Sequence, residues 1–118
     1  MNQTTPLRHP IPDQLVELIA QRFRVLGEPM RIKLLDRLRE GPATVGELVE
    51  ATAASQQNVS KHLRVLLEAG IVSRAREGNF ARYAIADEAV FRLCEEVCGG
   101  LRAQFAELKA LIEEGTAR

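Results

Sequence analysis

The sequence predicts a mainly α-helical domain with one small β-hairpin. Apolar residues recur at spacings of three and four along most of the 118 residues, as they do on a helix with one buried side. Two short runs, residues 71–76 and 80–85, are strand-like instead and are separated by a turn. Aromatic residues make up 4% of the chain and Trp is absent, which favours helices over a β-sandwich or β-barrel. The length suits one domain with a modest core.

The N-terminal part of the chain is expected to be a flexible tail followed by two helices. Residues 1–12 carry three of the five prolines and no apolar repeat, which predicts the tail. A first helix is expected to begin with Asp13 as its cap and to end at Gly27-Glu28-Pro29. Pro29 suits the first turn of a second helix, which Gly41-Pro42 should end.

A short third helix and a tight turn are predicted next. Thr44 is followed three residues later by Glu47, which is a capping-box pattern at the start of a helix. This helix should end near Thr52, and Ala53-Ala54 should turn the chain into a fourth helix. Two short helices joined by such a turn form a helix-turn-helix.

The fourth helix, about residues 55–69, is predicted to have two faces of different chemistry. Ser55 is a suitable N-cap, and Gly70 suits a helix end in the left-handed conformation. The buried stripe should hold Val59, Leu63, Leu66 and Leu67. The other face carries Gln56, Gln57, Asn58, Ser60, Lys61 and Arg64. Because amides and hydroxyls hydrogen-bond base edges and cations neutralise phosphates, this composition predicts a helix that enters the major groove of DNA.

The two strand-like runs are expected to form a basic hairpin, the wing of a winged helix-turn-helix. Glu77-Gly78-Asn79 separates the strands and can supply the positive φ of a hairpin turn. Arg74 and Arg76 share one strand face, and Arg82 should point outward from the partner strand if Tyr83 and Ile85 face the core. We expect this wing, residues 71–85, to lie on the DNA backbone or in the minor groove.

The distribution of charge supports a nucleic-acid partner, although the whole chain is neutral. Residues 55–82 hold five cations against two acids, a net charge of +3, whereas residues 87–118 hold four against seven, a net of −3. Residues 1–54 balance at seven cations and seven acids. The positive charge therefore lies on the segment where nucleic-acid binding would need it.

A long last helix is predicted from Asp87, and its apolar stripe exceeds what a small winged domain can cover. The winged domain is expected to span residues 13–113, with 114–118 as a C-terminal tail. Gly99-Gly100 should mark a kink or a close approach of another backbone. The surplus of apolar surface predicts a homodimer through the first and last helices, with Leu15, Leu18, Ile19, Val90, Val97, Leu101, Phe105 and Leu108 at the interface. A two-fold dimer would present two recognition helices to a pseudo-palindromic double-stranded DNA site.

The order of these features resembles the ArsR/SmtB family of bacterial repressors. The matching stretches are residues 26–35 (LGEPMRIKLL), 45–48 (VGEL), 55–70, and Gly78 with Arg82-Tyr83, within roughly residues 20–90. The resemblance implies a homodimeric winged-helix transcription factor, usually a repressor that an effector releases. By family position, DNA contacts are implied at Gln56, Gln57, Asn58, Ser60, Lys61 and His62, with Arg76, Asn79 and Arg82 on the wing. His62 has an alternative, because a histidine beside Leu63 can pack or cap locally.

The usual metal sites of that family are not intact in this sequence. Where some members carry Cys-x-Cys on the third helix, this chain has Val45-Gly46-Glu47. Where others begin the last helix with Asp-x-His, this chain has Asp87-Glu88-Ala89, and Gly100 and Ala103 stand at the later ligand positions. Neither of these sites is expected here.

Cys94 and Cys98 are the remaining candidate effector site. Their i, i+4 spacing puts both sulfurs on one helix face, where they could bind a thiophilic metal or an arsenical, or react with an oxidant. The alternative is that both pack as small apolar side chains in the stripe, and this reading is the stronger one from sequence. No cofactor is otherwise indicated.

Other classes of function find less support. No glycine-rich phosphate loop, nucleophile elbow or paired His–carboxylate spacing is present, so we expect no enzyme. A winged helix used only for protein contact would not need five cations on one side. A regulator without a small-molecule effector, controlled by a partner protein, stays open. The N-terminus lacks the apolar run of a signal peptide and no segment is long enough to span a membrane, so we expect a cytoplasmic protein.

Overall fold

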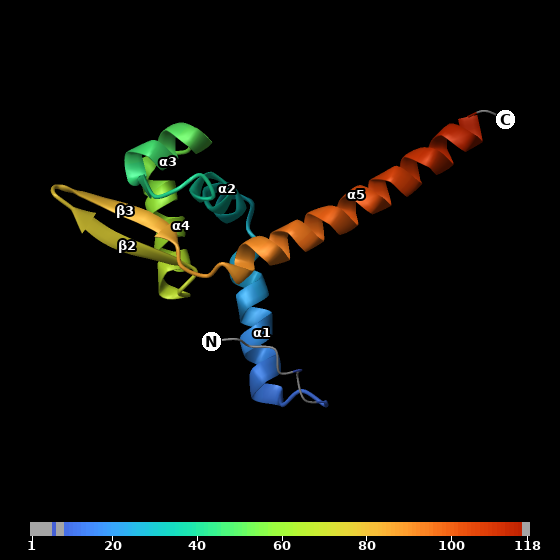
Figure 1. Cartoon of the computed structure of the whole chain (residues 1–118), viewed down its shortest axis with the longest axis horizontal. Coiled ribbons are helices and arrows are strands. Elements are labelled where there is room, and N and C mark those ends of the chain that lie inside the picture. Colours follow the sequence, from blue (N-terminus) through green and yellow to red (C-terminus); the bar gives the residue numbers. More distant parts are fainter. Residues whose placement is uncertain (1–5, 7–8, 117–118) are drawn as a thin grey trace. The chain divides into compact units, whose positions relative to one another are not determined.

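The computed structural model describes residue 6 and residues 9–116, without the side chains of residues 115 and 116. The chain forms two compact units, residues 1–86 and residues 87–118. In the described part, five helices and three strands follow one another (Figure 1): α1 (Asp13–Leu26), α2 (Pro29–Leu38), β1 (Ala43–Thr44), α3 (Val45–Thr52), α4 (Gln56–Glu68), β2 (Val72–Glu77), β3 (Phe80–Ile85) and α5 (Ala89–Thr116). The predicted winged helix-turn-helix, with four helices, a hairpin and a last helix, is confirmed.

The first two helices begin in different ways. Asp13 is the first residue of α1 rather than its cap, because Pro12 holds the N-cap position and no side chain caps this end. The N-cap of α2 is Glu28, whose Oε1 accepts hydrogen bonds from the backbone N–H of Met30 at 2.8 Å and of Arg31 at 3.3 Å. Within the predicted N-terminal tail, residues 9–12 form no helix or strand, and residues 1–5, 7 and 8 lie outside the described part.

The helix-turn-helix has the local signals that the sequence predicts. Thr44 Oγ1 accepts from Glu47 N at 3.2 Å and Glu47 Oε1 accepts from Thr44 N at 2.9 Å, which completes the capping box of α3. Ala53 ends α3 in the left-handed conformation, with φ at 58°. Ser55 Oγ accepts from Asn58 N at 3.1 Å and so caps α4. Gly70 follows α4 with φ at 75°.

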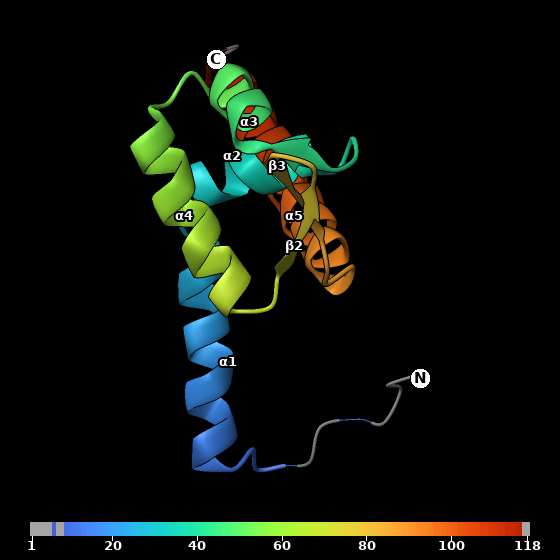
Figure 2. The ribbon, with the colours of Figure 1, turned by 90° about the vertical axis from the view of Figure 1, so that its left-hand side faces the viewer.

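The core of this unit lies between α2, α3 and α4, and it orients α4. These three helices contact one another in pairs, and Figure 2 shows α4 along one side of the unit. Their fully buried or nearly buried side chains are Leu34, Leu35, Leu38, Leu48, Val59, Leu63 and Leu66. Burial of one such side chain stabilises the fold by about 1.5–3 kcal/mol. The outer face of α4 is therefore set by how its inner face packs.

The hairpin belongs to a three-stranded antiparallel sheet of order β1-β3-β2. The short strand β1 was not predicted from sequence; it pairs Ala43 with Tyr83 and Thr44 with Arg82. The turn is one residue shorter than predicted, because Glu77 still pairs with Phe80 and leaves only Gly78-Asn79 between the strands. Gly78 has φ at 63°, as a two-residue hairpin turn requires.

The second unit is the single helix α5. It begins at Ala89, two residues later than predicted, and Asp87 Oδ1 accepts from Ala89 N at 3.0 Å in front of it. The helix runs through Gly99-Gly100 without interruption, so the predicted kink is absent from the described helix. Apart from the adjacent residues and the nearby backbone of α5 itself, no described atom lies within 4 Å of a Cβ built at either glycine. It continues to Thr116, so the tail predicted from residue 114 is helical at its start, and residues 117 and 118 lie outside the described part.

No helix in the described part of the chain is both long enough and apolar enough to cross a membrane.

Candidate nucleic-acid interface

The two faces of α4 differ in burial as the sequence predicts, except that Leu67 of the predicted buried stripe is only half-buried. Val59, Leu63 and Leu66 are 0% exposed and face the core. The polar side chains on the other side are exposed or, for Asn58, half-buried; they are Gln56, Gln57, Asn58, Ser60, Lys61 and Arg64. Because the inner face is packed, these amides, hydroxyls and cations are held toward solvent on a rigid element. That arrangement suits contact with base edges and phosphates.

Two surface hollows lie along this polar face. The α4–wing hollow has a volume of about 470 Å³ and is lined by Gln57, Ser60, Lys61, Arg64, Leu67, Glu68, Arg74 and Tyr83. A second hollow of about 560 Å³ lies at the start of α4 and is lined by Ser55, Gln57, Asn58 and Lys61. Gln57 and Lys61 line both hollows. The two hollows therefore bring together Arg74 of the wing and five predicted residues of α4, which are Gln57, Asn58, Ser60, Lys61 and Arg64. Gln56, Arg76 and Asn79 line neither hollow.

Arg64 is already paired within its own helix. Its Nε lies 3.8 Å from Oε2 of Glu68, and both side chains are largely exposed, at 80% and 72%. An exposed i, i+4 pair of this kind contributes only about 0.3–0.5 kcal/mol. Arg64 can therefore exchange this partner for a phosphate at little cost.

His62 does not lie on the exposed face, which corrects its assignment as a DNA contact. The residue is 6% exposed. Its Nδ1 accepts a hydrogen bond from Arg31 Nε at 3.1 Å, and its Nε2 lies 3.8 Å from Oε1 of Glu28. Arg31 also donates from Nη1 to the Val25 carbonyl at 3.0 Å. His62 thus connects α4 to the start of α2 and to the end of α1, which is the local packing role held open from sequence.

Arg82 is separated from the other wing arginines by the strand register. Arg74 pairs with Tyr83 and Arg76 pairs with Ala81, whereas Arg82 pairs with Ala75. Side chains of directly paired residues lie on the same sheet face and neighbours along a strand alternate. Arg74 and Arg76 therefore share one face, and Arg82 lies on the other. The expectation that all five cations lie on one side is corrected at Arg82.

Two carboxylates hold Arg82 on its face of the wing. Its Nε donates to Oε1 of Glu77 at 2.6 Å, and its Nη1 lies 3.5 Å from Oε1 of Glu47. The hydrogen bond to Glu77, with the charge of that carboxylate, raises the pKa of Arg82 above its ordinary value. The hydrogen bond from the Thr44 backbone lowers the pKa of Glu47, and the Arg82 charge acts in the same direction. Sequence inspection missed these partners because they lie far from Arg82 along the chain or across a turn.

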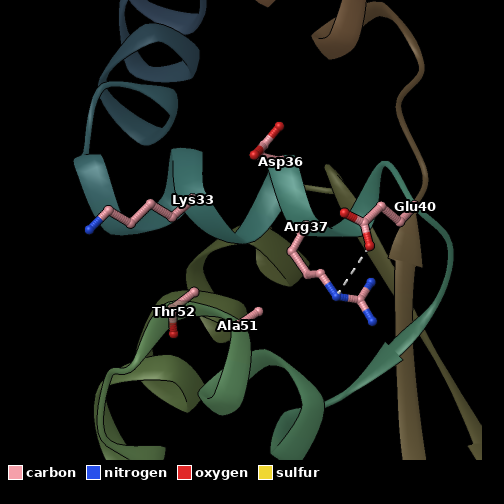
Figure 3. Close-up of a pocket in the computed structure, with 6 residues that line it drawn as sticks. All are labelled: Lys33, Asp36, Arg37, Glu40, Ala51 and Thr52. Atoms are coloured by element: carbon pink, nitrogen blue, oxygen red, sulfur yellow. Dashed lines mark ion pairs between the residues drawn. The ribbon is translucent and has the colours of Figure 1, made fainter.

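A third hollow, of about 300 Å³, lies between α2 and α3 and is not part of this surface. It is lined by Lys33, Asp36, Arg37, Glu40, Ala51 and Thr52. Figure 3 shows Arg37 and Glu40 turned toward each other, and Arg37 Nε lies 3.8 Å from Glu40 Oε1. Two acids match its two cations, so this hollow lacks the net positive charge that a phosphate surface needs.

The cysteines of α5 are both free and exposed in this chain. They lie among exposed apolar side chains of the same helix, which are Val97, Leu101, Phe105, Leu108, Leu111 and Ile112. Packing against the other side chains of α5 therefore does not bury Cys94 or Cys98. Within residue 6 and residues 9–116, no cluster of three or more His, Cys, Asp or Glu side chains is placed to hold a metal ion.

The residues predicted for a dimer interface differ in exposure. Leu18, Val97, Leu101, Phe105 and Leu108 are exposed, between 53% and 71%. Leu15 and Ile19 are half-buried. Val90 is 3% exposed in the single chain. Val16 and Phe23 on α1 are exposed apolar residues that the prediction omitted.

Comparison with known proteins places this architecture in a family. Residues 28–74, from the start of α2 to β2, match the model of the bacterial regulatory protein arsR family. The HTH-type transcriptional regulator NmtR of Mycobacterium tuberculosis is 36% identical over 87 residues, which are 74% of this chain and 72% of that protein. The probable mercury resistance operon repressor of Streptomyces lividans is 39% identical over 85 residues, 72% of this chain and 63% of that protein.

Solved structures of transcriptional regulators also superpose on this chain. The crystal structure of Rv0081 of M. tuberculosis superposes with a TM-score of 0.73 at 32% identity, covering 81% of this chain and 97% of that one. The AntR antimony-specific transcriptional repressor superposes with a TM-score of 0.72 at 30% identity, covering 88% and 98%. The match spans less than two-thirds of some relatives, 63% of the S. lividans repressor and 58% of the repressor SmtB of M. tuberculosis.

The family model spans the helix-turn-helix, the relative NmtR is matched over more than two-thirds of its length, and the structure of Rv0081 superposes on 81% of this chain. The chain therefore belongs to the ArsR/SmtB family of winged-helix transcriptional regulators.

Proposed function

We propose that this protein is a dimeric, sequence-specific DNA-binding repressor that acts in the cytoplasm. The observation that supports this most directly is the rigid polar face of α4, whose Gln57 and Lys61 line both surface hollows. In this proposal α4 enters the major groove and the wing lies on the backbone or in the minor groove. Three of the chain's relatives are named as regulators or repressors.

The proposal divides the polar surface into base readout and phosphate contact. Gln56, Gln57 and Asn58 lie in the first turn of α4, where amides can read adenine edges bidentately. Lys61, Arg64, Arg74 and Arg76 supply positive charge for phosphates, with Ser60 and Asn79 as neutral donors. His62 and Arg82 are not proposed as DNA contacts. His62 is buried, and Arg82 is held by two carboxylates.

Exposed apolar surface supports the homodimer. Leu18 and Phe23 on α1 and Leu101, Phe105 and Leu108 on α5 are all more than half exposed. Contiguous apolar side chains of this kind mark interaction surfaces in soluble proteins. A second copy with the same stripes would cover them, and its recognition helix would then read the second half of a pseudo-palindromic site. One structural relative, from Mycobacterium bovis, is described as a homodimeric winged helix-turn-helix DNA-binding domain.

A thiol-based effector response is the second part of the proposal. Cys94 and Cys98 are exposed and one helical turn apart. Two such thiolates could bind a thiophilic metal or an arsenical, and two protomers could bring four together. Relatives are named for mercury, arsenical and antimony responses. The alternative is a regulator without a small-molecule effector, controlled by a partner protein.

DNA binding is tested by titrating the purified, reduced protein on genomic DNA fragments at two salt concentrations. Fragment-selective binding that weakens steeply with salt is expected, because phosphate contacts release counterions. Gln57→Ala should lose discrimination between selected and random DNA by roughly 1–3 kcal/mol if Gln57 reads a base. The control is Gln21→Ala, an exposed amide on α1. Absence of selective binding at either salt concentration would refute the DNA-binding proposal.

The effector response is tested on the same fragments with Zn(II), Ni(II), trivalent arsenic and peroxide. Release by one of these in the wild type, and not in Cys94→Ser/Cys98→Ser, would support the thiol sensor. Selective binding that none of them changes would contradict it and direct attention to a partner protein.

A further inference from the structure

Arg82 stands between the wing and the first helix of the helix-turn-helix. It donates to Glu77 across the hairpin at 2.6 Å and lies 3.5 Å from Glu47 on α3. We propose that Arg82 is a positioning residue, which with Glu47 and Glu77 fixes the wing against α3 and does not itself contact phosphate. The proposal rests on the proposed DNA-binding function, because its purpose is to hold the wing in register with α4 on one DNA site.

Glu47 contacts Arg82 and also completes the capping box at the start of α3. The same oxygen, Oε1, accepts from the backbone N–H of Thr44 at 2.9 Å and lies 3.5 Å from Arg82 Nη1. Thr44 is also the residue that pairs with Arg82 across β1 and β3. The capping box, the short strand β1 and the ion pair therefore meet at one place, so α3 and β3 are joined through both backbone and side chains.

The outer part of the wing has little else to hold it. In β2 only Val72 is buried, and every residue from Ser73 to Glu77 is exposed. The third strand, β1, reaches β3 only at Arg82 and Tyr83. In β3 Phe80 is exposed and residues 81–85 are half-buried, and a two-stranded hairpin with so little burial is marginally stable. The contacts of Arg82 are therefore a main restraint on the angle at which the wing leaves the domain.

Charge argues against a phosphate contact at Arg82. One guanidinium faces two carboxylates, so the cluster of Arg82, Glu47 and Glu77 carries a net charge of −1. Arg74 and Arg76 lie on the other sheet face, and Arg74 lines the α4–wing hollow with Lys61. A phosphate would meet these two arginines at lower electrostatic cost than it would meet Arg82.

The decisive experiment compares the DNA affinity of Glu47→Gln with that of the wild type, and the direction of the change decides between the two roles. Glutamine can still complete the capping box, so α3 keeps its cap while the charge opposite Arg82 is lost. If Glu47 did no more than repel the DNA phosphates, loss of its charge would strengthen DNA binding. We expect binding to weaken about two- to five-fold, the range of an exposed ion pair. The matched control is Glu68→Gln on α4, where loss of an acid that lines the α4–wing hollow should leave binding equal or stronger.

Salt dependence separates positioning from phosphate contact at Arg82 itself. Arg74→Gln should reduce the slope of log affinity against log salt by about 0.9 for a lost phosphate contact. Arg82→Gln should weaken binding at every salt concentration with the slope unchanged. The double variant Glu47→Gln/Arg82→Gln should bind no more weakly than Arg82→Gln, because the two changes remove one interaction. A slope reduced as in Arg74→Gln, or stronger binding by Glu47→Gln, would overturn the proposal.

Amide hydrogen exchange of the free protein tests the positioning without DNA. Faster exchange of the β2 and β3 amides is expected in Glu47→Gln and in Arg82→Gln, with α2 and α4 unchanged. Unchanged exchange in the wing would refute the positioning role whatever the DNA results. If the wild-type protein selects no DNA fragment, the proposed function is refuted. If wing exchange is nevertheless faster in the two variants than in the wild type, the restraint on the wing is still established.

Discussion

Arg31 Nε on α2 donates to Nδ1 of His62 on α4 at 3.1 Å, in a site where the histidine is 6% exposed. The two residues are 31 positions apart in sequence. This hydrogen bond links the proposed recognition helix to the helix behind it, and Glu28, which caps α2, lies on the other side of the imidazole.

Removal of this link should destabilise the fold rather than abolish DNA contact directly. In His62→Ala, Arg31 Nε loses its acceptor in a part-buried site, and we expect a loss of about 1–3 kcal/mol in the free energy of unfolding. Urea denaturation measures it. Arg64→Ala on the exposed side of the same helix is the control, with an expected change within about 0.5 kcal/mol. Equal effects of the two substitutions would contradict the role given to His62.

The cap of the recognition helix should have a measurable effect of its own. Ser55→Ala removes the Oγ that accepts from Asn58 N at 3.1 Å, and this should cost about 1 kcal/mol of stability. Ser73→Ala, at an exposed position in β2, is the control. A thermal melt of each variant makes the comparison, and a cap that contributes nothing would leave both melting temperatures alike.

Glu47 should make the stability of the domain depend on pH in the acidic range. Its pKa is lowered in the folded state, first by the hydrogen bond from the Thr44 backbone, from an ordinary value of 4.5. The unfolded chain therefore binds a proton at this site more readily than the folded chain. The resulting stabilisation is fully present above the ordinary pKa and is lost as the pH falls through the lowered one.

Thermal midpoints between neutral pH and about pH 3 test this dependence. The wild type should lose more stability over the acidic part of the range than Glu47→Gln, which has no carboxyl at this position. Glu50→Gln, on the same helix, is the control. Parallel curves for the wild type and Glu47→Gln would show that this carboxylate does not contribute.

The apolar stripe of α5 should determine the oligomeric state. Phe105 is 71% exposed in the single chain, and Phe105→Glu places a charge where a second copy is proposed to pack. We expect sedimentation equilibrium to show a shift from dimer to monomer, with weaker binding to a two-half-site DNA. Ala103→Glu adds the same charge on the other side of the helix, since residues two apart do not face each other. A dimer that survives Phe105→Glu but not Ala103→Glu would place the interface elsewhere.

Local features of this protein can be predicted from its sequence because short-range interactions determine them. Thr44 and Glu47 lie three residues apart, and their side chains reach each other's backbone as soon as one turn of helix forms. The stripe of Val59, Leu63 and Leu66 likewise follows from helical spacing alone. The helix-turn-helix, the hairpin and the division of α4 into two faces therefore follow from short stretches of the sequence.

The candidate site was predicted less completely, and His62, one of its two corrected residues, shows why. His62 stands beside the exposed Lys61 in sequence, at the boundary between the two faces of α4, where spacing alone does not decide burial. Its burial depends on Arg31 and Glu28, which α2 brings to it.

The elements of this protein, their order and the polar composition of α4 can thus be derived from sequence alone, because each depends on residues within a few positions of one another. Which of its cations are free to contact phosphate, in contrast, depends on the tertiary fold. The register of β2, β3 and β1 separates Arg82 from Arg74 and Arg76 and brings it to Glu47. Charge–charge interactions depend on distance in space, and strand pairing between distant segments sets that distance.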